Sequence, residues 1–182
     1  WDPSRDQKAL IKEFLEGYYG SGAQYLQQYL DLINEPAAKR MNWGLSTYNG
    51  DLSFFPLQAQ MKANQLFDQA EAAVKNDATK LYRVQRERLP LQHLALQNYA
   101  FDQKLSETRG SYPTTRAAAD AVAADYRDEA NKFFADADKF GLNFISEGGA
   151  FDSAKPGILM RPDSWIPPEL PKAGAKLEPG QF

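Results

Sequence analysis

Paired carboxylates on the first predicted helix are the plainest candidates for catalytic chemistry. Glu13 and Glu16 lie three positions apart, so their side chains are neighbours on one helix face, and Lys8 and Lys12 precede them at salt-bridge spacing. The two carboxylates that hydrolyse a glycosidic bond face each other across a cleft, about 5–10 Å apart. One exposed helix face makes no cleft, so the spacing favours a solvated charged surface over a catalytic pair.

The remaining polar candidates are one histidine and one basic cluster. His93 is the single histidine and has no partner nearby in the sequence, which favours a packed or half-exposed helix side chain over a catalytic base. Arg83, Arg86 and Arg88 could hold a phosphate or sulfate group, with Glu87 among them. Salt bridges to neighbouring acidic helices are the interpretation that we favour for this cluster.

Aromatic residues gather in the longest irregular segment of the helical part. Trp43, Tyr48, Phe54 and Phe55 stand in or beside the turn-forming residues between 36 and 53. Aromatic rings on loops can stack on the apolar faces of sugar rings, but large aromatic side chains more often fill the core. Core or interdomain packing is therefore favoured, and substrate binding by Trp43 and Tyr48 is the functional alternative.

Composition excludes several classes of protein. The chain has 182 residues and a net charge of -3, so it lacks the basic surface expected of a nucleic-acid binder. It has no cysteine, which excludes disulfide scaffolds, thiol catalysis and cysteine-ligated zinc or iron–sulfur centres. No run approaches 18 apolar residues, and no strand precedes the glycines at 17, 20 and 22. We therefore expect no membrane span, no metal, no cofactor and no catalytic residue in this chain.

Hydrophobic residues recur at helical spacing through most of the sequence. Five segments with this spacing are predicted to be helices, namely residues 1–20, 22–35, 56–74, 78–106 and 114–140. Pro36 is expected to end the second helix, and Pro90 is expected to kink or divide the fourth. Together these segments predict an all-α fold of about five helices in a bundle, which occupies a helical domain of residues 1–149.

Each predicted helix has an apolar stripe that marks its buried side. The stripe of the first helix consists of Leu10, Ile11, Phe14, Leu15 and Tyr18. That of the third consists of Leu57, Met61, Leu66, Phe67, Ala70 and Val74. That of the fifth consists of Val122, Tyr126, Ala130, Phe133, Ala137 and Phe140.

The last part of the chain has a different character, because six of the 11 prolines lie at or after position 156. Residues 150–182 are predicted to form an extended Pro-rich arm over the helical body, or else a linker. The large apolar residues that favour the wrapped arm are Ile158, Leu159 and Trp165.

Two segments resemble a known family. The first contains Trp1-Asp2-Pro3, Phe14-Leu15-Glu16-Gly17-Tyr18-Tyr19-Gly20, Ala23 and Tyr25-Leu26-Gln27-Gln28-Tyr29-Leu30. The second is Arg83-Val84-Gln85-Arg86-Glu87-Arg88-Leu89-Pro90-Leu91-Gln92. Both resemble the C-terminal helical part of the domain-of-unknown-function 4838 family, over residues 1–105. Some members of that family belong to glycoside hydrolase family 163.

The resemblance implies a secreted or periplasmic retaining endo-β-N-acetylglucosaminidase that acts on N-glycans. In that architecture a (β/α)₈ barrel carries both catalytic carboxylates, and the helical region follows it. This sequence contains no barrel strands, so no catalytic residue of the family is carried over. The chain begins at Trp1 and not at Met, which we expect of a processed chain or of a piece of something longer.

The expected function is therefore a helical accessory domain that is not catalytic by itself. Its expected partners are the catalytic barrel, in the same or a separate chain, and a glycan contacted by the loop of residues 43–55. The main alternative is a free-standing helical protein-interaction module, which would bind another protein through its Pro-rich arm. A third possibility is a small self-sufficient hydrolase that uses Glu13, Glu16 or His93.

Overall fold

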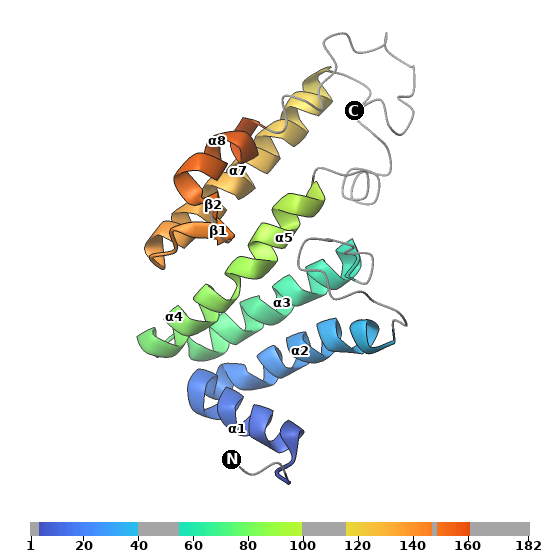
Figure 1. Cartoon of the computed structure of the whole chain (residues 1–182), viewed down its shortest axis with the longest axis vertical. Coiled ribbons are helices and arrows are strands. Elements are labelled where there is room, and N and C mark those ends of the chain that lie inside the picture. The colour runs from blue at the N-terminus through green and yellow to red at the C-terminus, as the bar shows by residue number, and fades with distance from the viewer. Residues whose placement is uncertain (1–3, 40–54, 100–115, 147–148, 161–182) are drawn as a thin grey trace. The chain divides into compact units, whose positions relative to one another are not determined.

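The computed structural model in Figure 1 describes residues 4–39, 55–99, 116–146 and 149–160. These residues are mainly helical, so the all-α bundle class expected from the sequence is confirmed. Among the helices of these ranges, none combines the length and the hydropathy that a bilayer-spanning segment requires. The chain divides into two compact units, residues 1–91 and residues 92–182.

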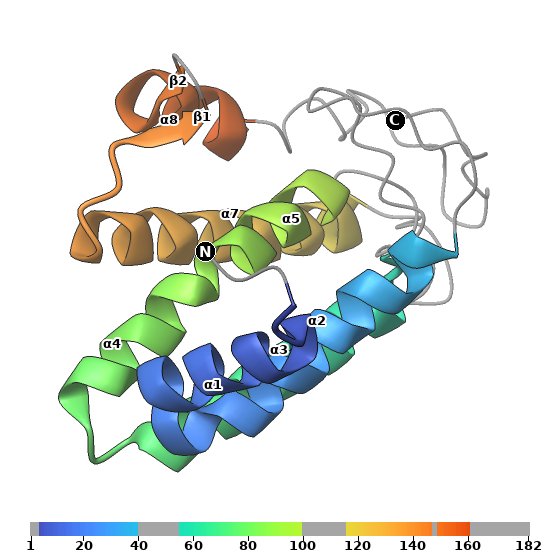
Figure 2. The same ribbon diagram turned by 60° about the horizontal axis from the view of Figure 1, so that its bottom comes forward.

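The first two helices are joined by a short connection that begins with a glycine. The first helix, α1, runs Gln7–Tyr19, and the Asp6 carboxylate caps it by accepting a hydrogen bond of 2.8 Å from the Lys8 backbone N–H. Gly20 then takes a φ of 57°, which glycine adopts far more readily than other residues. The 3₁₀ turn η1 (Gly20–Gly22) leads directly into α2 (Ala23–Ala38), so α1 packs against α2 (Figure 2).

The prolines of the first unit act differently at different positions. The prediction that Pro36 ends α2 is wrong, because the helix continues to Ala38 with Pro36 in its last turn. Proline lacks the N–H of one helical hydrogen bond, but only two helical residues follow it here, so little helix depends on that bond. Pro90 does divide the fourth predicted helix, into α4 (Ala78–Glu87) and α5 (Leu89–Tyr99), because a proline is well accommodated in a first turn.

The first unit is a four-helix bundle. Helix α3 (Leu57–Val74) contacts α2 and α4, while α1 contacts both α2 and α4, which closes the ring. The side chains buried at its centre include Leu15, Tyr19, Leu26, Leu66, Phe67, Val74 and Val84. Met61, expected in the core, is 53% exposed. It lies about 200° around the helix from buried Ala63, on the opposite side of α3.

The second unit is built on α7 (Arg116–Lys139), and the six predicted residues are all buried, five on this helix and Phe140 directly after it. The helix ends before Gly141, which has a φ of 67°. A short antiparallel pair follows, β1 (Phe144–Ser146) with β2 (Gly149–Ala150). Helix α8 (Phe151–Met160) then packs against α7 (Figure 2).

The start of the expected extended arm is helical. Residues 151–160 form α8 although Pro156 lies inside it, so the prediction of an extended chain is wrong for this stretch. Phe151 and Ile158 are buried, which explains the outcome, because tertiary packing of an apolar face outweighs the hydrogen bond that proline removes. Ile158 is thus an anchor, but on a helix. Trp165 and the rest of residues 161–182 lie outside the described residues.

Candidate functional site

Glu13 and Glu16, the paired carboxylates of the sequence, are both in ion pairs on the exposed surface of α1. A Glu13 carboxylate oxygen lies 2.9 Å from an Arg5 guanidinium nitrogen, and the Glu13 side chain is 71% exposed. Glu16 lies 3.8 Å from the Lys12 ammonium and is 60% exposed. Side chains this exposed are screened by solvent, so the two carboxylates form a charged surface and do not face each other across a cleft for a glycosidic bond.

The histidine and most of the arginine cluster have packing roles. His93 belongs to the second unit, where its ring stacks on that of Phe133 with centroids 5.6 Å apart. Arg88, the C-cap residue of α4, reaches α3, where it pairs with Asp68 at 2.7 Å and with Glu71 at 3.0 Å. Salt bridging to a neighbouring acidic helix, the interpretation favoured for the cluster, describes Arg88. Arg83 instead donates to the Tyr18 backbone carbonyl.

The predicted binding residues Trp43 and Tyr48 lie outside the described residues, as does Phe54. Phe55, at the end of the same aromatic segment, is 2% exposed. Its backbone carbonyl accepts a hydrogen bond of 3.0 Å from the buried Gln60 side chain. For Phe55 the core interpretation therefore holds, while the substrate-binding role of Trp43 and Tyr48 stays a prediction.

The two segments that carry the family resemblance meet at the contact between α1 and α4. The Arg83 guanidinium lies 4.0 Å from the centre of the Tyr18 ring and donates a hydrogen bond of 2.9 Å to the Tyr18 carbonyl. The Tyr19 hydroxyl donates to the Glu87 carboxylate at 3.2 Å. Burial raises the pKa of Tyr19, and the adjacent Glu87 charge raises it further, so Tyr19 stays a neutral donor. These four residues fix α1 on the bundle.

Half of the apolar side of α1 is left uncovered by the bundle. Leu15 and Tyr19 are each 5% exposed, whereas Leu10 is 36%, Phe14 59% and Tyr18 37% exposed. Leu10, Phe14 and Tyr18 recur every fourth residue and form one continuous strip, which we name the outward face. The Phe14 and Tyr18 rings stack on each other with centroids 5.3 Å apart. The outward face is therefore an ordered apolar surface.

An apolar groove runs beside the outward face. It measures about 460 Å³ and lies between α1 and α2, and Glu87 of α4 lines the end at which its carboxylate accepts from Tyr19, the last α1 residue of the wall. Its lining is almost wholly hydrophobic and includes Leu10, Ile11, Phe14, Tyr19, Leu26, Tyr29 and Leu30. Burial raises the pKa of Tyr29, and the Glu87 charge adds to that rise. Glu87 thus makes one end of the groove negative, while the rest is uncharged.

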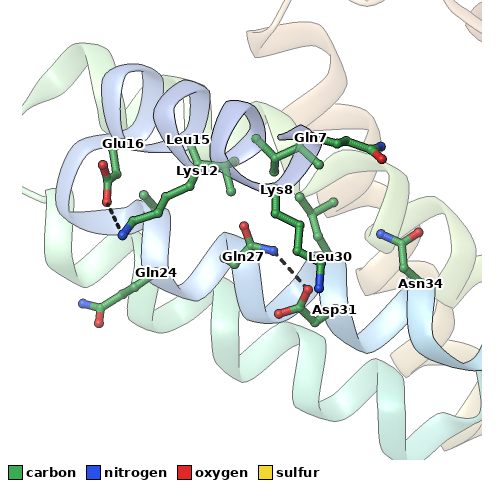
Figure 3. Close-up of a pocket in the computed structure, with 12 residues that line it drawn as sticks. Gln7, Lys8, Lys12, Leu15, Glu16, Gln24, Gln27, Leu30, Asp31 and Asn34 are labelled. Carbon is green, nitrogen blue, oxygen red and sulfur yellow. Dashed lines mark hydrogen bonds and ion pairs between the residues drawn. The ribbon is translucent and has the colours of Figure 1, made fainter. Parts of the chain in front are cut away.

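A second groove with polar walls lies on the other side of α1 and measures about 680 Å³ (Figure 3). Two pairs of its polar side chains form along single helices, Lys12 with Glu16 on α1 at 3.8 Å and Gln27 with Asp31 on α2 at 3.0 Å. Among the described residues, no hydrogen bond or ion pair joins α1 to α2 across it. Both grooves are lined by Ile11, Leu15, Leu30 and Asn34, so the two grooves flank the contact between α1 and α2.

The chemistry available in this arrangement is binding. Within the part of the chain that the structure describes, no cluster of three or more histidine, aspartate or glutamate side chains could hold a metal ion. The outward face and its groove offer hydrophobic area with one carboxylate. The apolar stripe of α1 was predicted correctly from the sequence, but all of it was assigned to the core. The breadth of the stripe was the available signal that part of it is uncovered. Comparisons of the chain with protein-family models, curated proteins and solved structures give no match.

Proposed function

We propose that this chain is a helical accessory domain that supports the catalytic barrel of a glycoside hydrolase-like enzyme and docks on it through the outward face of α1. The observation that carries the proposal is the exposure of Leu10, Phe14 and Tyr18 in one strip next to an apolar groove. Contiguous apolar patches on a protein surface mark interaction sites, because exposing them to water is unfavourable.

The family resemblance supplies the identity of the partner. It implies a (β/α)₈ barrel that precedes the helical region, so α1 is the helix nearest to the barrel along the polypeptide. The Tyr19–Glu87 contact supports this role, because Tyr19 is buried and holds α1 on α4, while Arg83 fixes Tyr18 within the exposed strip. A rigid helix loses little conformational entropy on docking.

In this proposal the reactive carboxylates belong to the barrel. The solvated ion pairs of Glu13 and Glu16 support that assignment, and so does the packing of His93 on Phe133. The reaction is hydrolysis of N-glycans by an endo-β-N-acetylglucosaminidase in a secreted or periplasmic setting. Trp43 and Tyr48 remain the proposed glycan contacts, and their replacement by Ala in the barrel-bearing enzyme should raise KM. An unchanged KM would remove that contact from the proposal.

A free-standing interaction module is the second candidate, and the outward face favours it equally. The two candidates differ in the partner. Sedimentation velocity of the 182-residue chain, alone and mixed with a barrel-bearing polypeptide encoded with it, separates them. The accessory-domain proposal predicts a complex with the barrel, and no glycan hydrolysis by the chain alone. Failure to associate with such a barrel, or hydrolysis without one, would overturn it.

A further inference from the structure

We infer that the apolar groove between α1 and α2 receives the apolar face of a helix from the partner, and that a basic residue of this helix pairs with Glu87. The inference rests on the proposed docking function and names the element and the charge that dock. Its basis is the shape of the groove, the nature of its walls and the single charge at one end.

The groove has the length of a short helical recognition site. Its lining extends from Leu10 to Tyr19 along α1, which at 1.5 Å per residue is about 13–14 Å. A docking helix that places anchors at positions i, i+3 or i+4, and i+7 needs about 10–11 Å. The strip of Leu10, Phe14 and Tyr18 adds a ridge at i+4 spacing, against which the side chains of a second helix can interdigitate.

The walls favour a helix over an added strand. Both long walls are helices whose backbone groups bond within the helix, so they present no row of free N–H and C=O groups to an extended chain. The Tyr19 hydroxyl, which could otherwise donate to the carbonyl of an extended peptide, is already bonded to Glu87. What the walls offer is hydrophobic area, and this matches the apolar side of an amphipathic helix.

Glu87 sets the charge of the occupant. Its side chain accepts from Tyr19 and, within the described residues, forms no salt bridge. Arg83, one turn earlier on α4, is held instead over the Tyr18 ring. The exposed carboxylate therefore has remaining acceptor positions beside an apolar surface, where a Lys or Arg can lay its aliphatic stem on the groove and its charge on Glu87.

The test uses three stapled 16-residue helical peptides with one leucine stripe. They differ only one turn beyond the stripe, where they carry Lys, Gln or Glu. Fluorescence anisotropy with the full chain should give a Kd about five-fold lower for the Lys peptide than for the Glu peptide. Glu87→Gln should reduce that ratio to less than about two-fold without abolishing binding, because the apolar contacts remain. Leu10→Gln/Phe14→Gln should weaken all three peptides.

Four results would overturn the inference. One is equal binding of the Lys and Glu peptides, and another is no binding of any peptide. The third is binding of a peptide of residues 161–182 that is tighter than binding of the Lys peptide, and the fourth is self-association of the chain that Phe14→Gln abolishes, since either would assign the groove to this chain itself. Association with the barrel that survives Leu10→Gln/Phe14→Gln would instead refute docking through the outward face, so the two failures are distinguishable.

Discussion

Arg88 should contribute more to the stability of the first unit than any exposed charge on the same helix. Its guanidinium pairs with Asp68 at 2.7 Å and Glu71 at 3.0 Å, and it donates to the Asn64 side-chain oxygen at 2.8 Å. The Arg88 side chain is only 18% exposed. We therefore expect Arg88→Met to keep most of the aliphatic packing but to remove the ion pairs that link the end of α4 to α3.

The expected loss follows from the exposure of each partner. Asp68 is 65% exposed, so its pair contributes about 0–1 kcal/mol. Glu71 is 24% exposed, and a hydrogen bond to a charged group in such a place contributes about 1–2 kcal/mol after allowance for solvent. The bond to Asn64 is lost as well, but the Met side chain recovers packing. The net loss in the free energy of unfolding is about 2 kcal/mol.

Urea unfolding followed by far-UV circular dichroism measures this loss in the transition of the α1–α4 bundle. Arg86→Met is the matched control, because Arg86 is exposed in the last turn of α4, two residues before Arg88, and forms no ion pair within the described residues. The control should change stability by less than about 0.5 kcal/mol. Equal midpoints for the two variants would refute the reasoning, since the Arg88 network would then contribute nothing beyond a solvated charge.

Three further outcomes are expected. Gly22→Ala should destabilise the bundle by about 1–2 kcal/mol in the same unfolding assay, because the added Cβ would lie 3.3 Å from a Val74 methyl; a stability at or above wild type would contradict this packing. Gly17→Ala should instead stabilise it by about 0.5–1 kcal/mol, since nothing lies within 4 Å of the added methyl on exposed helix α1; a loss would show a contact that the structure lacks. The Lys80 side chain and backbone N–H hold the pKa of Asp77 below its usual value, so the ionised carboxylate stabilises the fold at pH values above the unfolded-state pKa, and this stabilisation is lost as pH falls through the lower folded-state pKa. Asp77→Asn should remove this part of the acid-induced loss of stability. An unchanged curve of stability against pH would contradict this prediction.

Local patterns predicted the helices well, because each depends on residues close in sequence. On α7 the predicted buried side is correct throughout, since a stripe between charged residues leaves one choice of face. Met61 was misplaced because its position on α3 lies away from the line of buried Ala63, Phe67 and Val74. Only the neighbouring helices decide which apolar positions of a helix are covered.

The candidate site depended on contacts that no local pattern contains. Tyr19 and Glu87 are 68 positions apart, and their hydrogen bond requires the ring of four helices to close. The sequence showed that the stripe of α1 is broad, but it could not divide the stripe into a covered and an uncovered half. That division depends on how many helices surround α1, which is a property of the bundle. Trp43 and Tyr48 stay predictions.

The most direct test of the docking claim is the affinity of the chain for a barrel-bearing partner, measured by isothermal titration calorimetry for wild type, Leu10→Gln/Phe14→Gln and Met61→Gln. Met61 is the matched control because it is as exposed as Phe14 but lies on α3. Leu10→Gln/Phe14→Gln should weaken the binding free energy by about 2 kcal/mol, which corresponds to a Kd roughly thirty-fold higher. Met61→Gln should keep the wild-type Kd. Equal Kd values for all three proteins would contradict the account.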